Sequence, residues 1–101
     1  MIYHVNTTTV LPGRDAEAAQ VAQKFTAYVN ANFSGIHVQI VRNVNGEARQ
    51  IHWIATHDSL GHFEAFRQQI ASDAQFHELM AEGSGSIDFH NSIDHFYQVI
   101  A

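Results

Sequence analysis

The segment from Ile36 to Phe66 (IHVQIVRNVNGEARQIHWIATHDSLGHFEAF) restricts the possible folds more than any other part of the chain. It contains two runs rich in β-branched and aromatic residues, with Asn45-Gly46 between them. Asn-Gly is the strongest short-range hairpin signal, because a type I′ turn needs φ > 0 at both central residues. A two-residue loop at this position would pair Val38 with Trp53. The segment therefore predicts an antiparallel hairpin that leads directly into a helix.

Side chains of this hairpin alternate between two faces that differ in polarity. The first face is almost entirely apolar and carries Ile36, Val38, Ile40, Ile51, Trp53 and Ala55. The second face mixes polar and apolar side chains and carries His37, Gln39, Val41, Asn43, Ala48, Gln50, His52, Ile54 and Thr56. We expect the apolar face to lie against the core.

The same register brings two arginines together, because Arg42 would lie directly opposite Arg49 beside the turn. Like charges in this arrangement are destabilising by up to ~1 kcal/mol. We expect a carboxylate to relieve the repulsion, from Glu47 or from a second chain; a bound anion is the alternative.

A strand and two helices are predicted around the hairpin. The first strand, Ile2 to Val10, ends before Pro12-Gly13, and a helix from Asp15 to about Asn32 follows it. That helix has one apolar stripe, formed by Ala18, Ala22, Phe25, Val29 and Phe33.

The second helix follows the hairpin, with Asp58 or Ser59 as its N-cap. Its inner face would carry Leu60, Phe63, Phe66 and Ile70. Ser72-Asp73 interrupts the helix, and Ser72 with Gln75 has the form of a capping box that starts it again.

The predicted order of elements is β-α-β-β-α-β, completed by a long strand from Ile87 to Ile100 with a break or bulge at Asn91-Ser92. This order is that of the ferredoxin-like α+β sandwich, an antiparallel four-stranded sheet with both helices on one face. The other face would carry the mixed set of the hairpin, which is too apolar for full exposure. We therefore expect a homodimer that forms through the open sheet face.

Composition narrows the class of protein further. A length of 101 residues predicts one domain, residues 1–101, and the chain has no cysteine for disulfide or thiolate chemistry. The net charge of −5 without a basic cluster argues against nucleic acid and anionic membranes as partners. There is no apolar run of membrane length and no signal-peptide pattern, so we expect a cytoplasmic protein.

Several motifs together resemble the dimeric α+β barrel superfamily, in particular its NIPSNAP-like and antibiotic-biosynthesis-monooxygenase-like small proteins. They are Leu11-Pro12-Gly13 after the first strand, Gln50-Ile51-His52-Trp53, Asp58-Ser59-Leu60 before an aromatic-rich helix, and Ser72-Asp73. The resemblance implies the dimeric fold. It does not specify one activity, because the superfamily includes cofactor-free oxygenases, haem-degrading enzymes and members with no known activity.

The site residues that we predict follow from this resemblance and from the hairpin. Trp53, Phe63 and Phe66 would line a pocket for a flat ligand between sheet and helices, with Asn6 as a polar anchor. His52 or His62 would be the proton carrier. The plainer alternatives are a core role for Trp53, an interface hydrogen bond for His52 and a solvated side chain for His62.

Neither a haem nor a metal site is expected. Asn6 matches the Asn of the haem-degrading branch, but the positions of its Trp and His fall near Gln69 and Leu79. His57, Asp58 and His62 flank a helix start, yet no pair of histidines has the H-x-x-x-H spacing of a helical zinc motif. We favour scattered surface or interface histidines.

The sequence therefore favours a small-molecule-binding enzyme that resembles cofactor-independent monooxygenases and acts on an aromatic or polyketide-like substrate. In such chemistry the substrate supplies the electrons for dioxygen, and the protein supplies orientation, desolvation and a proton-transfer group. The alternative is a non-catalytic dimeric binding or stress-response module of the NIPSNAP-like type.

Overall fold

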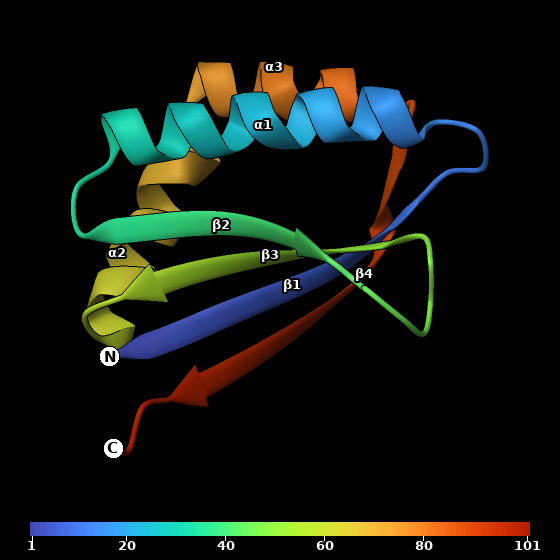
Figure 1. Ribbon diagram of the computed structural model, residues 1–101. Helices are drawn as coiled ribbons and strands as arrows, with labels where there is room; N and C mark the ends of the chain where they lie inside the picture. Colours follow the sequence, from blue (N-terminus) through green and yellow to red (C-terminus); the bar gives the residue numbers. More distant parts are fainter.

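The computed structural model describes all 101 residues as one four-stranded antiparallel sheet with three helices on one of its faces. The elements are β1 (Ile2–Val10), α1 (Asp15–Asn32), β2 (Ile36–Arg42), β3 (Gln50–His57), α2 (Leu60–Ala71), α3 (Ala74–Gly83) and β4 (Ile87–Gln98). The strand order is β2-β3-β1-β4, so the first and last strands pair with each other. In Figure 1, α1 and α3 run side by side above the sheet, and α2 covers one end. The predicted ferredoxin-like α+β fold is confirmed.

The helix-facing side of the sheet carries the core. Its buried side chains form two clusters, one around Trp53 beneath α1 and one around Val29 between α1 and β2. The predicted apolar face of the hairpin is the covered one, because Ile36, Val38, Ile51, Trp53 and Ala55 are all buried. Alternation along the strands therefore identified the two faces correctly.

The hairpin register differs from the predicted one. Val38 pairs with Ala55 rather than Trp53, and Ile40 pairs with Trp53. The connection is not a two-residue type I′ turn, because no residue other than glycine has a positive φ. Instead, Asn43 closes a wider loop by donating a hydrogen bond to the Glu47 carbonyl at 2.7 Å. The shift is two residues, so each side chain keeps its predicted face.

This wider loop also separates the two arginines. Arg42 pairs with Ile51, and Arg49 lies in the loop, where its carbonyl accepts a hydrogen bond from the Val10 amide at 2.7 Å. The predicted direct opposition of Arg42 and Arg49 is therefore wrong.

The second predicted helix is divided into α2 and α3, as the Ser72-Asp73 signal indicated. Ser59 caps α2 by accepting a hydrogen bond from the His62 amide at 3.1 Å. The cap of α3 is Asp73 rather than Ser72, because the Asp73 carboxylate accepts from the Phe76 amide at 2.8 Å. Leu60 does not belong to the inner face, since it is 58% exposed.

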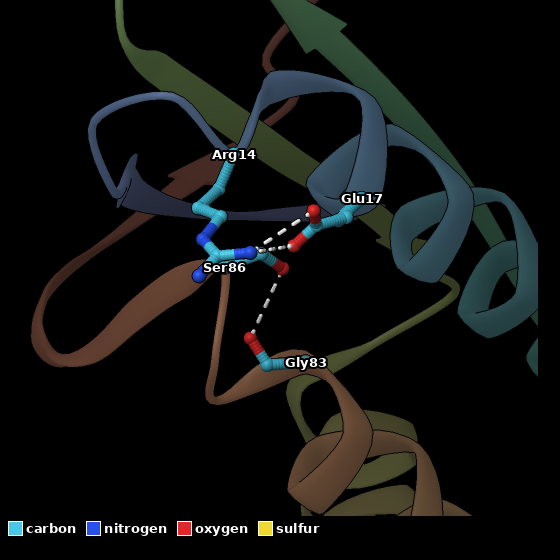
Figure 2. A network of polar contacts seen from close by, with 4 residues as sticks. All are labelled: Arg14, Glu17, Gly83 and Ser86. Atoms are coloured by element: carbon cyan, nitrogen blue, oxygen red, sulfur yellow. Dashed lines mark hydrogen bonds and ion pairs between the residues drawn. The ribbon is translucent and has the colours of Figure 1, made fainter.

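The β4 strand begins next to the end of β1 and contains the predicted irregularity. Figure 2 shows Ser86 donating to the Gly83 carbonyl at 3.3 Å, near the Arg14–Glu17 ion pair at 3.1 Å. Beyond this anchor, Thr9 pairs with Asp88 but Thr7 pairs with Ile93. Four β4 residues therefore lie opposite Thr8, which is a bulge at residues 89–92.

The open face of the sheet remains rich in apolar groups. Tyr3, Val41, Ile93 and Tyr97 are each at least 40% exposed.

None of the three helices combines the length and apolar character that a membrane crossing needs.

Candidate functional site

A cavity of about 580 Å³ lies between the helix-facing side of the sheet and helices α2 and α3. Two-thirds of its lining residues are hydrophobic, 12 of 18. The lining consists of His4, Asn6, Phe25, Ile36, Val38, Trp53, Ala55, Phe63, Glu64, Phe66, Arg67, Ile70, Phe76, Met80, Phe89, Ser92, Asp94 and Phe96. The volume and apolar character are typical of small-molecule sites, which measure about 300–1,000 Å³.

The aromatic wall of the cavity is held in place by ring contacts and one buried hydrogen bond. Trp53 donates its indole N–H to the Thr8 hydroxyl at 2.8 Å, and its ring meets Phe25 edge-on at 5.1 Å. Phe63 meets Phe96 edge-on at 5.0 Å, and both rings line the cavity. Edge-to-face contacts of this kind fix ring orientations and leave flat faces for a planar ligand.

The polar end of the cavity consists of His4, Asn6 and Asp94. Register places Asn6 directly opposite Asp94, with His4 two residues away on the same face. The Asp94 Oδ1 atom lies 2.7 Å from Nε2 of His4 and accepts a hydrogen bond from Nδ2 of Asn6 at 2.8 Å. The His4 ring stacks on Phe96, with centroids 4.6 Å apart and planes 7° from parallel.

The charge state of Asp94 determines the tautomer of His4. Partial burial raises the pKa of the Asp94 carboxyl, but the hydrogen bonds from Asn6 and His4 outweigh burial and hold it below its usual range. An ionised carboxylate only accepts hydrogen bonds, so Nε2 of a neutral His4 carries the hydrogen and Nδ1 carries a lone pair. His4 Nδ1 makes no hydrogen bond within the chain. This dyad can take a proton from a bound ligand.

The predicted site residues are divided between the two faces of the sheet. Asn6, Trp53, Phe63 and Phe66 all lie in the cavity lining. His52 lies on the opposite face, where Nδ1 is 2.8 Å from the Thr7 hydroxyl and Nε2 is 2.6 Å from Oδ1 of Asn43. It cannot reach a ligand in this cavity.

His62 lies outside the lining as well. Its Nδ1 is 3.0 Å from Nδ1 of His57, and its Nε2 is 3.0 Å from the Ser34 carbonyl oxygen. Both ring nitrogens of His62 are therefore occupied by contacts within the protein. Nowhere in the chain do three or more His, Asp or Glu side chains form a group that could hold a metal ion.

Sequence reasoning missed His4 and Asp94. The signal for His4 was present in the first strand. His4 and Asn6 lie on the same face as Ile2 and Thr8, which are buried against the core. Two polar residues at core-facing positions indicate a site. Asp94 had no comparable signal, because the bulge at residues 89–92 changes which β4 residues face the helices.

The comparisons with known proteins add a shared fold. No protein-family model matches this chain, and no curated protein matches it. A NIPSNAP domain protein from Burkholderia xenovorans has 15% identity over 100% of this chain and 96% of its own, with a TM-score of 0.83. A candidate antibiotic biosynthesis monooxygenase from Caulobacter crescentus has 19% identity over 99% and 90% of the two chains, with a TM-score of 0.80. SnoaB, a cofactor-independent oxygenase from Streptomyces nogalater, has 19% identity over 99% and 93%, with a TM-score of 0.71.

These solved structures include both groups that the sequence motifs resemble. The resemblance to NIPSNAP-like and monooxygenase-like proteins is thus confirmed for the fold. Because proteins on one fold perform many different reactions, function depends on the cavity.

Proposed function

We propose that this protein binds a flat aromatic or polyketide-like molecule in the cavity and oxygenates it with dioxygen, without a bound cofactor. The observation that carries the proposal is the His4–Asp94 pair at the polar end of an aromatic cavity, with Nε2 and Oδ1 2.7 Å apart. A histidine base next to an apolar cavity can remove a proton from a carbon that is made acidic by neighbouring aromatic rings. The structural likeness to SnoaB agrees with this chemistry.

The proposed reaction converts a ring-activated methylene and dioxygen into a carbonyl and water. Nδ1 of His4 takes one proton from the methylene, and the resulting carbanion is delocalised over the aromatic rings. The carbanion adds dioxygen through a new C–O bond, and the peroxide takes the proton back from His4. Cleavage of the O–O bond with loss of the second methylene hydrogen then gives the carbonyl and one water, so the substrate supplies all four electrons.

We further propose that the active form is a homodimer that covers the open sheet face. Tyr3 pairs with Tyr97 and Thr7 with Ile93, so β1 and β4 place large exposed apolar side chains on this face. A second copy of this chain, related by a two-fold axis, would bury these apolar side chains against its own open face.

The test uses anthrone, whose central methylene lies between two aromatic rings and next to a conjugated carbonyl. We expect the protein to bind anthrone with quenching of Trp53 and to convert it to anthraquinone, with one dioxygen consumed per molecule. His4→Gln should retain binding and lose turnover by about 10²–10⁴-fold, the typical contribution of a general base. Binding without oxygen uptake would instead identify a non-catalytic binding module, and absence of binding would contradict both functions.

A further inference from the structure

His57 contains a buried nitrogen without a hydrogen-bond partner. The residue is 1% exposed, and its Nε2 is the one buried side-chain nitrogen or oxygen in the chain without a partner. Leaving such a group unpaired destabilises the folded chain, because the nitrogen loses its hydrogen bond to water and gains no other. A buried unpaired group in a native protein is therefore a sign that something else, such as a ligand or water, completes it.

The neighbours of His57 determine what Nε2 can bind. The Ser34 carbonyl only accepts, so Nε2 of His62 at 3.0 Å must carry a hydrogen. A neutral His62 then has a lone pair on Nδ1, which accepts from Nδ1 of His57 at 3.0 Å. One imidazole hydrogen remains per ring, so Nε2 of His57 carries a lone pair. It can accept a hydrogen bond and cannot donate one.

Strand register places His57 next to the polar end of the cavity. Ile2 pairs with His57 and His4 pairs with Ala55, so His4 and His57 are diagonal neighbours on the helix-facing side. The two nitrogens of an imidazole point in different directions, so Nε2 points away from His62. The ring of Phe63 contacts both imidazoles edge-on, with centroids 5.3 Å from His4 and 5.4 Å from His57. Phe63 belongs to the cavity lining and His57 does not, so His57 lies behind a lining side chain that it contacts.

We propose that His57 is a second ligand-binding residue, whose Nε2 accepts a hydrogen bond from a hydroxyl group of the ligand when the Phe63 ring moves aside. This inference deepens the proposed function and rests on it. It narrows the substrate class to aromatics that can present a hydroxyl group, such as phenols and the enol tautomer of anthrone. A ligand that offers only acceptors, such as a quinone or an aryl ether, leaves the nitrogen unpaired.

The test compares 1-naphthol with 1-fluoronaphthalene, which has a similar shape but no donor. We expect wild-type protein to prefer 1-naphthol, and His57→Phe to lose roughly two- to tenfold of that preference, the usual effect of one neutral hydrogen bond. His77→Phe, at an exposed residue outside the cavity lining, is the matched control and should keep the preference. Full retention of the preference in His57→Phe, an equal loss in His77→Phe, or equal binding of both ligands by wild type would overturn the inference and leave the proposed function intact. Binding of neither ligand would overturn both.

A second measurement on wild-type protein does not depend on the folding of a variant. The ¹⁵N resonance of His57 Nε2 should shift on addition of 1-naphthol and stay unchanged with 1-fluoronaphthalene. A resonance that already shows a hydrogen bond in the free protein and ignores both ligands would mean that an internal water completes the group, and would contradict the proposal.

Discussion

His4 and Asp94 lie 90 residues apart in the chain, yet His4 Nε2 and Asp94 Oδ1 are 2.7 Å apart. Their contact depends on the pairing of β1 with β4, which joins the first and last strands of the sheet. The polar end of the cavity therefore exists only when β4 has paired in register. Once formed, the carboxylate fixes which nitrogen of His4 is free to act on a ligand.

Replacement of Asp94 by Asn should reduce turnover while ligand binding changes little. The amide carries no charge and offers an N–H as well as an oxygen, so it no longer fixes one tautomer of His4. We expect anthrone oxidation to fall about tenfold or more, within the range for a disturbed general base. The ¹⁵N spectrum should show His4 losing its single tautomer, which a purely structural role would not produce.

The matched control for this change is Asp88→Asn on the same strand. Asp88 is partnered by Asn91 at 2.6 Å and lies outside the cavity lining. Its replacement should leave anthrone turnover and the His4 tautomer unchanged. Equal losses in the two variants would show that the effect of Asp94 is not specific to the dyad.

Truncation of Phe66 should cost less stability than truncation of a core residue. A Phe→Ala change at a completely buried position lowers the free energy of unfolding by about 3–5 kcal/mol, because the missing ring leaves an empty cavity. Phe66 already borders the cavity, so part of its surface has no packing to lose. We expect urea denaturation to show a loss clearly below that range for Phe66→Ala, together with weaker quenching of Trp53 by aromatic ligands. Ile87→Ala, at a residue that is 1% exposed, is the core control and should show its full loss of about 2–5 kcal/mol.

Local patterns in the sequence were sufficient to predict which side chains face the helices and which face away from them. A period of two residues separates the buried Val38 and Trp53 from the open-face His52, and this separation survives a register error of two residues. The positions of the helix starts were also predictable, because Ser59 and Asp73 act through their own side chains on the next turn, although the predicted cap of α3 was the adjacent Ser72. Such signals depend on neighbours in the chain.

The parts that were mispredicted depend on contacts between distant residues. Asn43 in the wider loop also contacts His52, nine positions away, and this contact is outside the local Asn-Gly signal that predicted the register. The β4 bulge turns Asp94 towards the helices, and its size depends on the pairing with β1. The dyad could therefore not be inferred from periodicity, although the polar His4 and Asn6 pointed to that end of the sheet.

The proposed dimer can be disrupted by one charge on the open face. Ile93 is 56% exposed and pairs with Thr7 on that face. Static light scattering should give twice the chain mass of 11.3 kDa for wild type and the single mass for Ile93→Asp. Burial of an unpaired carboxylate in an apolar interface is the physical reason. Val44→Asp, at a fully exposed loop residue, should remain dimeric; a monomeric wild type would contradict the proposal.

The stability of the protein should decrease between pH 7 and pH 5 because of His57. Burial lowers the pKa of His57 from 6.5 to about 4, and the neighbouring His62 and His4 contribute to the same effect. Between these two values the unfolded chain binds a proton that the folded chain does not, so the free energy of unfolding falls as the pH falls. The loss should be about 2 kcal/mol between pH 7 and pH 5, and on the order of 3 kcal/mol once both forms are protonated.

Urea denaturation at several pH values measures this loss, and two variants assign it to His57. His57→Phe removes the titrating group, so its free energy of unfolding should vary less between pH 7 and pH 5. His77→Gln removes an exposed histidine whose Nε2 lies 2.6 Å from the Ala71 carbonyl oxygen, and should keep the wild-type pH dependence. A wild-type pH dependence in His57→Phe would mean that His57 is not held neutral by its surroundings. The lone pair on which the second ligand contact depends would then be protonated in the folded protein at mildly acidic pH, and the preference for 1-naphthol should disappear over the same range.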